Sequence, residues 1–447
     1  MEESLQRALL RAQVIVDEAK GRHITNQAII RQLDMLRDAM HRGCYILDAF
    51  RYQSHDEDED AKDQNALFLL EQLQESLNNL SSLILDVNEV VVFLASYPRL
   101  YSQPYSMHLL LGNCMFGRQS ECELAINFLL HTNNNPRGSE EFEVLPIVGP
   151  GKVGKSTLVA YVCRNERVHD HFSEILFLRD HDLTDDGLSK FREGCAMKHQ
   201  NHIPNTKKEH MRWPLVVDLV GDLKEDAWDR LYSSCKRCMP SNSKMIVTNR
   251  SDKIIKFGTT HALSLKYLSR EALWYFFKTV AFGSMDPKMH PRLAHLAMDI
   301  ANLLSGSLIG ANIMACLLRE NFDIRFWCKT LAFFRGFIQR HVPKYGVHPM
   351  FLINQNRSIH LGRVGAPFED LVFCGEYESC SQEEVPKITV HDVMYGSGKA
   401  ALGKFEALAW RSPIPPYSSY VYSCEIQELK SSGCKRKRSI KYVTNLC

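Results

Sequence analysis

The 447-residue sequence predicts an α/β domain, a parallel sheet covered by helices, between an N-terminal helical bundle and a second helical region. Three observations lead to this prediction. Residues 1 to about 100 contain few Gly or Pro residues and repeat apolar residues at helical spacing. From about residue 110, short apolar runs alternate with helical stretches. From Ser269 to about His341 the pattern is helical again, rich in Leu, Ala and Phe.

The first 100 residues are expected to form a helical bundle that binds another protein. Their clearest pattern is a stripe of seven apolar side chains at alternating steps of three and four residues, which share one face of a helix. The stripe comprises Leu70, Leu73, Leu77, Leu80, Ile84, Val87 and Val91. It fits packing inside a small bundle, and it also fits a seam for self-association or a partner helix.

Five apolar runs in the central region are expected to be strands. Buried parallel strands have continuous apolar runs, and their alternation with helices implies crossover connections. The runs are Val144–Val148, Ile175–Leu178, Leu215–Val217, Met245–Thr248 and Ala262–Leu265.

Composition excludes several classes of protein. Lys plus Arg number 54 and Asp plus Glu number 52, a balance that argues against nucleic acid as the main partner. No run of about 18 apolar residues exists, so no membrane span is expected. The N-terminus lacks the features of a signal peptide, and the 14 cysteines are scattered, which indicates reduced thiols in the cytoplasm. The stretch Lys435–Arg438 fits either a nuclear import signal or a solvated basic tail.

The strongest motif is a glycine-rich loop that directly follows the first expected strand. Residues Gly149 to Thr157 read GPGKVGKST and fit the pattern G-x-x-x-x-G-K-[ST]. Glycines let the backbone curl around phosphate, so that successive N–H groups and a helix N-terminus point at one anion. In this interpretation Lys155 reaches the terminal phosphates and the Ser156 hydroxyl ligates Mg²⁺. The sequence therefore predicts a P-loop NTPase fold.

Two further strands end in residues that suit the same chemistry. Asp218 follows Leu215–Val217 and could hold Mg²⁺ through water, which makes it the one candidate for a catalytic role. Arg250 follows Met245–Thr248 and would lie at the carboxyl edge of the sheet, where ligands of open α/β sheets bind. An arginine at that edge can sense a terminal phosphate.

These pieces, in this order, resemble the NB-ARC domain of plant disease-resistance proteins of the coiled-coil, nucleotide-binding, leucine-rich-repeat class. The resemblance implies a coiled-coil-type domain over residues 1–100, a nucleotide-binding domain over 110–268, an ARC1-like helical region over 269–345 and a degenerate, partly irregular region over 346–447. It implies ADP or ATP with Mg²⁺ as ligands. It also assigns a set of nucleotide contacts to this sequence, namely Gly117, Arg118, Gly149, Gly151, Val153, Gly154, Lys155, Ser156, Thr157, Arg250, Leu308 and His391.

The sequence also departs from the family pattern. Leu219 stands where a second acid would follow Asp218, and Leu308 stands where the family has a proline that packs on adenine. Val390-His391-Asp392 is similar to the triplet whose histidine contacts the ADP β-phosphate. No leucine-rich-repeat array is found in the 447 residues.

Three functions follow from these observations. The first is an ADP/ATP-binding switch similar to the immune receptors, with the bundle contacting either a second copy or another receptor. The second is a degenerate scaffold that binds nucleotide weakly or not at all, which Leu219 and Leu308 favour. The third is an active P-loop ATPase or kinase. Because Leu219 cannot orient water, we expect at most a very slow ATPase.

Overall fold

The computed structural model describes residues 1–428 apart from 21, 23, 25, 53–58, 95–96, 98–114, 131–141, 173–174, 202–213, 220, 222, 241–242, 305, 365, 367–368, 380–383, 397–402 and 415–416. The chain folds as two compact units. The first comprises residues 1–335 and 412–418, and the second comprises residues 336–411 and those after 418. Each unit is described by itself.

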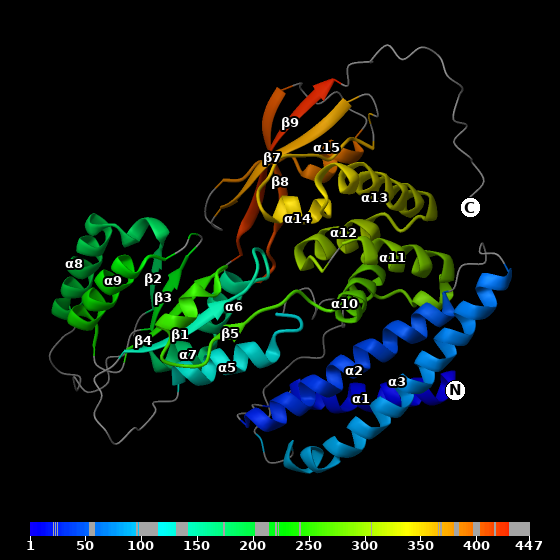
Figure 1. Ribbon diagram of the computed structural model, residues 1–447, viewed down its shortest axis with the longest axis horizontal. Coiled ribbons are helices and arrows are strands. Elements are labelled where there is room, and N and C mark those ends of the chain that lie inside the picture. The colour runs from blue at the N-terminus through cyan, green and yellow to red at the C-terminus, as the bar shows by residue number, and fades with distance from the viewer. Residues whose placement is uncertain are drawn as a thin grey trace. The chain divides into compact units, whose positions relative to one another are not determined.

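Three helices form the N-terminal bundle, which confirms the helical prediction for this region (Figure 1). They are α1 (Glu2–Lys20), α2 (Gln27–Arg51) and α3 (Glu59–Leu94). The Asn26 side chain caps α2 by accepting from the N–H groups of Ala28 and Ile29. Buried Leu5, Leu36 and Leu80 belong to one apolar core shared by all three helices.

The predicted apolar stripe on α3 mostly faces this core. Leu73, Leu80 and Val87 are fully buried, and Leu77 and Ile84 pack against the same cluster. Only the two end members, Leu70 and Val91, are exposed, at 37% and 40%. The stripe is therefore explained by packing against α1 and α2, and it needs no partner helix.

The five predicted strands form one parallel sheet, which confirms the predicted α/β fold. The strands are β1 (Glu143–Val148), β2 (Leu176–Arg179), β3 (Pro214–Asp218), β4 (Lys244–Asn249) and β5 (Leu263–Ser264), in the spatial order β2-β3-β4-β1-β5. The P-loop strand β1 thus lies between β4 and β5, and β4 separates it from β3.

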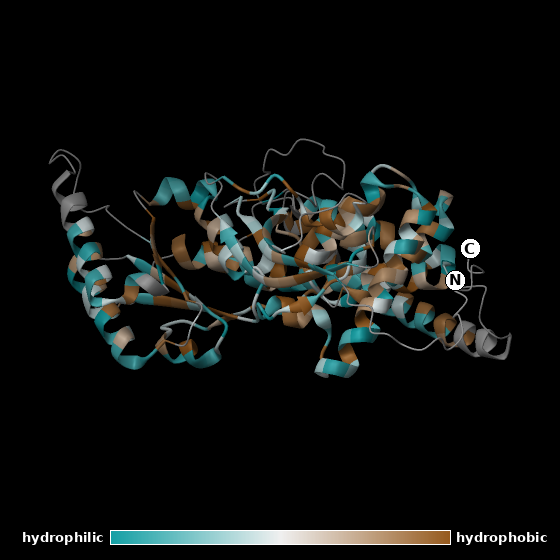
Figure 2. Cartoon of the chain, turned by 90° about the horizontal axis from the view of Figure 1, so that it is seen from above, coloured by the Kyte–Doolittle hydropathy of each residue, from teal (hydrophilic) through white to brown (hydrophobic). Residues whose placement is uncertain are grey.

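Helices cover both faces of the sheet. Helices α5 (Gln119–Leu130), α6 (Lys155–Cys163) and α7 (Glu166–His171) share an apolar cluster with one set of strand side chains. Helices α8 (Asp185–Asn201) and α9 (Glu225–Cys238) share a second cluster with the alternate set. Figure 2 shows hydrophobic strands between helices that carry hydrophilic residues. Short turns η1 (Asp180–Leu183) and η3 (Asp252–Phe257) follow β2 and β4.

A second helical region follows β5 within the first unit. It contains α10 (Arg270–Phe282), the short η4 (Pro287–Met289), α11 (Pro291–Leu303) and α12 (Leu308–Glu320), and it leads into α13 (Ile324–Tyr345). Ser269 caps α10 by accepting from the N–H of Ala272. Trp274, Phe276 and Phe277 on α10 are among the largest fully buried side chains of the described chain.

The second unit contains strands and helices within the region that the sequence predicts to be degenerate and partly irregular. Strands β6 (Ile359–His360), β7 (Glu369–Ser379), β8 (Gly403–Arg411) and β9 (Ser419–Glu428) form an antiparallel sheet in the order β6-β7-β9-β8. Short helices α14 (Pro349–Asn354) and α15 (Val390–Tyr395) accompany it. Burial alternates along β9, as expected for a sheet with one buried face. The stretch Lys435–Arg438 lies outside the described residues.

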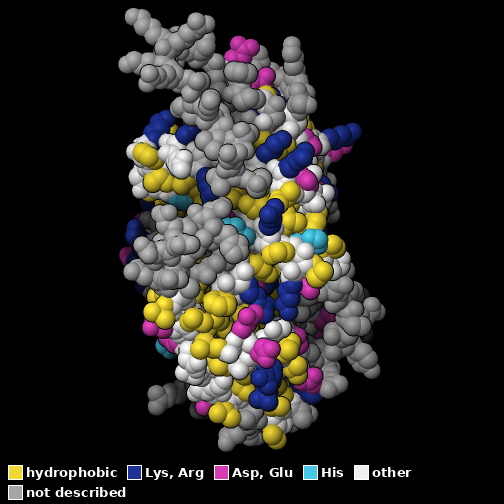
Figure 3. Space-filling model, turned by 90° about the vertical axis from the view of Figure 1, so that its right-hand side faces the viewer, with side chains coloured by type: hydrophobic (Ala, Val, Ile, Leu, Met, Phe, Trp, Pro, Cys, Tyr) yellow, Lys and Arg dark blue, Asp and Glu magenta, His cyan; other side chains and the backbone are white. Residues whose placement is uncertain are grey.

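Charges on the surface are mixed. On the face drawn in Figure 3, Lys and Arg side chains are interspersed with acidic and hydrophobic ones. Within the described part of the chain, no helix is both long enough and apolar enough to cross a bilayer.

Candidate nucleotide-binding site

The glycine-rich loop connects β1 to α6, the strand–loop–helix order that phosphate binding requires. A Cβ at Gly149 would lie 2.4 Å from the carbonyl oxygen of Leu265, so only glycine fits there. Gly154 is the N-cap of α6 with a left-handed φ of 96°, which glycine adopts at little cost. A Cβ added at Gly154 would meet no atom within 4 Å, so the space at the N-terminus of α6 is open.

Lys155 folds back into the loop at the first turn of α6. Its Nζ donates to the carbonyl oxygens of Gly149 at 2.8 Å and Pro150 at 2.9 Å. Burial, and after it the nearby Arg250 guanidinium, lowers the pKa of Lys155 to about 8, while the Asp218 carboxylate opposes the shift. Lys155, Arg250 and Asp218 therefore lie within electrostatic reach of one another.

Asp218 ends β3 beside Thr248 of β4, as the strand register requires. The Thr248 hydroxyl donates a hydrogen bond to the Asp218 carboxylate, which fixes its orientation. Arg250 is exposed just past the end of β4, and Ser156 is exposed on α6, next to Lys155. Thr157 is half-buried, whereas Val153 packs in the apolar cluster beneath α6.

Leu219 does not face this site. It is 3% exposed and belongs to the apolar cluster under α8 and α9, and its N–H donates to the carbonyl oxygen of Thr248 at 3.1 Å. The position that would carry a second acid is thus part of the core. Asp222, the next acid along the chain, lies outside the described residues.

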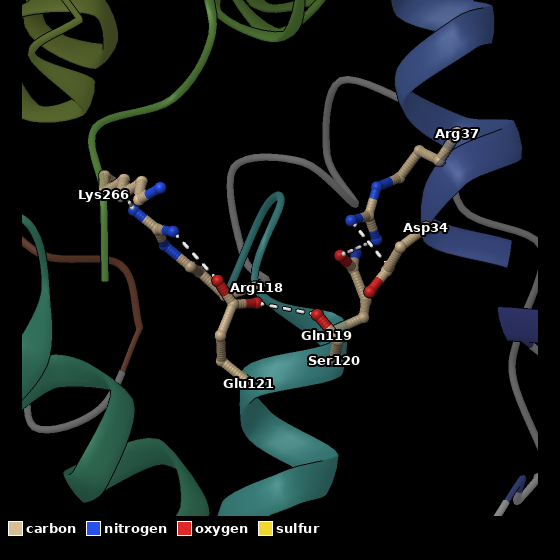
Figure 4. A network of polar contacts seen from close by, with 7 residues as sticks. All are labelled: Asp34, Arg37, Arg118, Gln119, Ser120, Glu121 and Lys266. Atoms are coloured by element: carbon tan, nitrogen blue, oxygen red, sulfur yellow. Dashed lines mark hydrogen bonds and ion pairs between the residues drawn. The ribbon is translucent and has the colours of Figure 1, made fainter. Parts of the chain in front are cut away.

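The turn at residues 115–118 reaches the site through its glycine and arginine. Gly117 has a φ of 67°, and a Cβ there would lie 2.8 Å from the Leu268 side chain. The buried Arg118 pairs with Glu121 at 3.0 Å and donates to the carbonyl oxygen of Lys266. Figure 4 shows this network and its continuation, where Arg37 of α2 donates to Gln119 at 2.8 Å.

Residues 265–268, which connect β5 to α10, contact both the glycine-rich loop and the 115–118 turn. We call them the linker. The Leu265 N–H donates to the carbonyl oxygen of Val148 at 2.8 Å, directly before the glycine-rich loop. The Tyr267 hydroxyl donates to the carbonyl oxygen of Gly151 at 3.0 Å. The sequence alone gives Tyr267 no role, because a tyrosine in a loop carries no spacing signal.

The linker also contacts the start of α12. Gly306 has a φ of 78°, and a Cβ there would lie 3.2 Å from the Tyr267 Cβ and 3.6 Å from the Leu268 carbonyl oxygen. Leu308 follows as the first residue of α12 and is half-buried, after the Ser307 cap. The structure thus brings the segment before Leu308 against the linker that contacts the loop.

His391 lies in the second unit, on α15, where its ring contacts Tyr395. Thr389 and Asp392 cap this short helix reciprocally, and the Thr389 hydrogen bonds lower the pKa of Asp392. The contact of His391 with a β-phosphate stays a prediction.

The loop fits a nucleoside phosphate. It offers an open helix N-terminus, a lysine, and a nearby arginine and carboxylate, so an anion would meet two cations and a set of backbone N–H groups. The exposed Ser156 hydroxyl and the Asp218 carboxylate supply oxygen atoms of the kind that Mg²⁺ prefers.

The parallel sheet and the glycine-rich loop together define a P-loop NTPase fold. Residues 126–286 match the family model of the NB-ARC domain. The matched range contains the glycine-rich loop, Asp218, Arg250 and the linker. It excludes the 115–118 turn, Leu308 and His391.

Relatives of known name are plant disease resistance proteins. The chain is 27% identical over 225 residues to disease resistance protein RGA2 of Solanum bulbocastanum, a match that covers 48% of this chain and 23% of that protein. It is 23% identical over 231 residues to the putative disease resistance RPP13-like protein 1 of Arabidopsis thaliana, covering 49% and 22%. The matches thus span less than a quarter of each relative's length.

Solved structures are more distant. Drosophila ORC bound to DNA is similar with a TM-score of 0.35 and 12% identity, over 56% of this chain and 77% of that one. Cdc6p from Pyrobaculum aerophilum is similar with a TM-score of 0.26 and 11% identity, over 42% and 61%.

Proposed function

We propose that the chain is an ADP/ATP-binding switch of the plant immune-receptor type, acting in the defence response. The observation that carries the proposal is the glycine-rich loop with Lys155 at its centre and Arg250 and Asp218 close by. The similarity to plant disease resistance proteins supports the choice of switch over other P-loop functions.

Each residue of the site has a part in binding. The loop N–H groups and the N-terminus of α6 would hold the phosphates. Lys155 would exchange its two carbonyl partners for phosphate oxygens, and Arg250 would contact the terminal phosphate. Ser156 and Asp218 would hold Mg²⁺, and the bound ion would neutralise phosphate charge.

A switch also needs a mechanical connection, and the linker provides it. Leu265 and Tyr267 contact the loop, and α10 begins two residues after the linker ends. A change of loop conformation on nucleotide exchange would therefore act on the helical region that follows.

The N-terminal bundle is the proposed site for protein partners, either a second copy or another immune receptor. Leu10 and Val14 lie one turn apart on α1 and are 60% and 69% exposed, which supports a contact there. We expect Leu10→Ser with Val14→Ser to reduce self-association or receptor capture in pull-downs, with the exposed Met289→Ser of η4 as control.

The proposed location is the cytoplasm, with Lys435–Arg438 as a candidate nuclear import signal.

Identifying the resident nucleotide tests the proposal. The purified chain is denatured, and the released nucleotide is separated by chromatography and quantified. Stoichiometric ADP supports the switch. An empty site in a folded protein that also fails to bind added ADP or ATP supports the scaffold, and rapid ATP turnover supports an ATPase.

A further inference from the structure

The Tyr267 hydroxyl fixes one peptide group of the glycine-rich loop. It donates to the carbonyl oxygen of Gly151 at 3.0 Å, while Lys155 bonds the two preceding carbonyl oxygens, those of Gly149 and Pro150. Three successive carbonyl groups of the loop are therefore held by side chains, and the third is held from the linker rather than from the loop itself.

Because a peptide group is planar, this hydrogen bond to the Gly151 carbonyl also sets the direction of the Lys152 N–H. In a trans peptide the C=O of one residue and the N–H of the following residue point in opposite directions. Because the Gly151 carbonyl faces Tyr267, the N–H of Lys152 faces away from Tyr267. Holding the carbonyl therefore prevents this peptide from rotating its N–H toward the linker.

Lys152 itself adopts a conformation that needs such support. Its φ is 61°, in the left-handed region that residues other than Gly rarely adopt. A left-handed residue within a loop is also what turns successive N–H groups toward one anion. The loop thus contains one strained residue in the conformation that suits phosphate, directly after the peptide that Tyr267 holds.

We propose that Tyr267 is a positioning residue of the phosphate-binding loop: its hydroxyl orients the Gly151–Lys152 peptide so that the Lys152 N–H faces bound phosphate. The proposal rests on the proposed nucleotide-binding function. Tyr267 also lies close to Gly306, before α12, because a Cβ added at Gly306 would be 3.2 Å from the Tyr267 Cβ. Loop geometry is thereby set jointly by the linker and by the helical region.

The test measures ADP affinity by calorimetry for the full chain and for Tyr267→Phe, which removes only the hydroxyl. We expect ADP binding to weaken about 3- to 10-fold, the effect of one net hydrogen bond. Tyr232→Phe is the matched control, because it removes a hydroxyl that accepts from the Phe142 N–H at 3.2 Å elsewhere in the same domain. This control should bind ADP as the wild type does.

A second background separates positioning from a general loss of structure. Lys152→Gly removes the left-handed strain, so the loop should adopt the binding conformation without the hydroxyl. In that background Tyr267→Phe should weaken ADP binding less than 2-fold. An unchanged affinity of the single Tyr267→Phe variant, or an equal loss in both backgrounds, would overturn the positioning role while leaving the proposed function intact. A folded wild type that binds neither ADP nor ATP would overturn both.

Discussion

The surroundings of Lys155 favour the binding of an anion. Lys155 is only 8% exposed, and the Arg250 guanidinium lies nearby. Its positive charge is therefore less stable than in water. Two carbonyl oxygens provide neutral partners, and a phosphate would provide charged ones. Exchange of these partners is therefore expected to favour binding.

Substitution of Lys155 should weaken nucleotide binding 10-fold or more. Lys155→Ala removes a charge-assisted contact that contributes about 1.5–3 kcal/mol. Lys155→Arg keeps the charge, but a planar guanidinium does not fit the position where Nζ contacts the carbonyl oxygens of Gly149 and Pro150. Calorimetry with ADP checks both variants, and unchanged affinity in both would refute the role of the loop.

The lowered pKa of Lys155 predicts a dependence of nucleotide affinity on pH. With a pKa of about 8 in the free protein, the lysine is charged at pH 7 and mostly neutral at pH 9. Phosphate binding favours the charged form, so ADP affinity should fall about 10-fold between pH 7 and pH 9, following the titration of one group. In Lys155→Ala this fall should disappear; a fall of the same size in the variant would assign it to another group.

At the scale of whole elements, a buried contact joins α2 of the bundle to α10 of the helical region. Asp48 of α2 accepts from the indole N–H of Trp274 at 2.9 Å and pairs with Lys278, both on α10. Burial is the largest single influence on the pKa of Lys278 and lowers it, but Asp48, together with Cys44 and Tyr52, raises it by more, so the net shift is upward. The Lys278 ammonium also lies 5.7 Å from the centroid of the Trp274 ring. The bundle is therefore bound to the helical region by a buried polar contact.

Breaking this contact should loosen the bundle. Lys278→Met leaves the Asp48 carboxylate buried without its cation, which should cost about 3 kcal/mol of unfolding free energy. Asp48→Asn with Lys278→Met should recover much of that loss, because Asn still accepts from Trp274. Urea unfolding measures both effects, and limited proteolysis between α3 and β1 reports release of the bundle. A double variant no more stable than Lys278→Met would argue against the pair.

Sequence patterns predicted those elements whose signal is local. The five parallel strands are continuous apolar runs, and the glycine-rich loop is a contiguous motif, so both could be placed before the structure. The antiparallel sheet was missed because β7 pairs with β9 rather than with β8, the next strand along the chain. Apolar and polar residues also alternate only weakly along Gly403–Arg411 and Ser419–Glu428. The partners of Asp48 lie 226 and 230 residues further along the chain, a separation that no spacing rule covers.

At the scale of the whole molecule, the end of β3 pairs a residue suited to Mg²⁺ binding, Asp218, with a residue unsuited to catalysis, Leu219. Asp218 faces the site and is oriented by Thr248, whereas Leu219 enters the apolar core beneath α8 and α9. In the proposed switch, the domain thus keeps the groups that would stabilise a bound phosphate, while the residue after Asp218 is not an acid that could orient water. Groups that act equally on ground state and transition state favour binding over rate, and a long-lived nucleotide state is what a switch requires.

This arrangement predicts that ATP hydrolysis is very slow. Without a water-positioning group the rate should be lower by a factor on the order of 10²–10⁴ than that of an ATPase that has one. Single-turnover hydrolysis of labelled ATP with Mg²⁺ measures the rate. A wild-type value near or above about 1 s⁻¹, the low end of common enzyme turnover, would contradict the switch and favour an ATPase.

Leu219→Asp should not restore activity, because the new carboxylate would be buried among apolar side chains. Burying that carboxylate should either cost several kcal/mol of stability or cause it to take up a proton. Asp218→Asn is the companion variant: it keeps the shape of the side chain and should weaken Mg²⁺-dependent ATP binding while leaving the melting temperature of the free protein nearly unchanged. If Leu219→Asp were as stable as the wild type and hydrolysed ATP faster, residue 219 would have to face the nucleotide rather than the core.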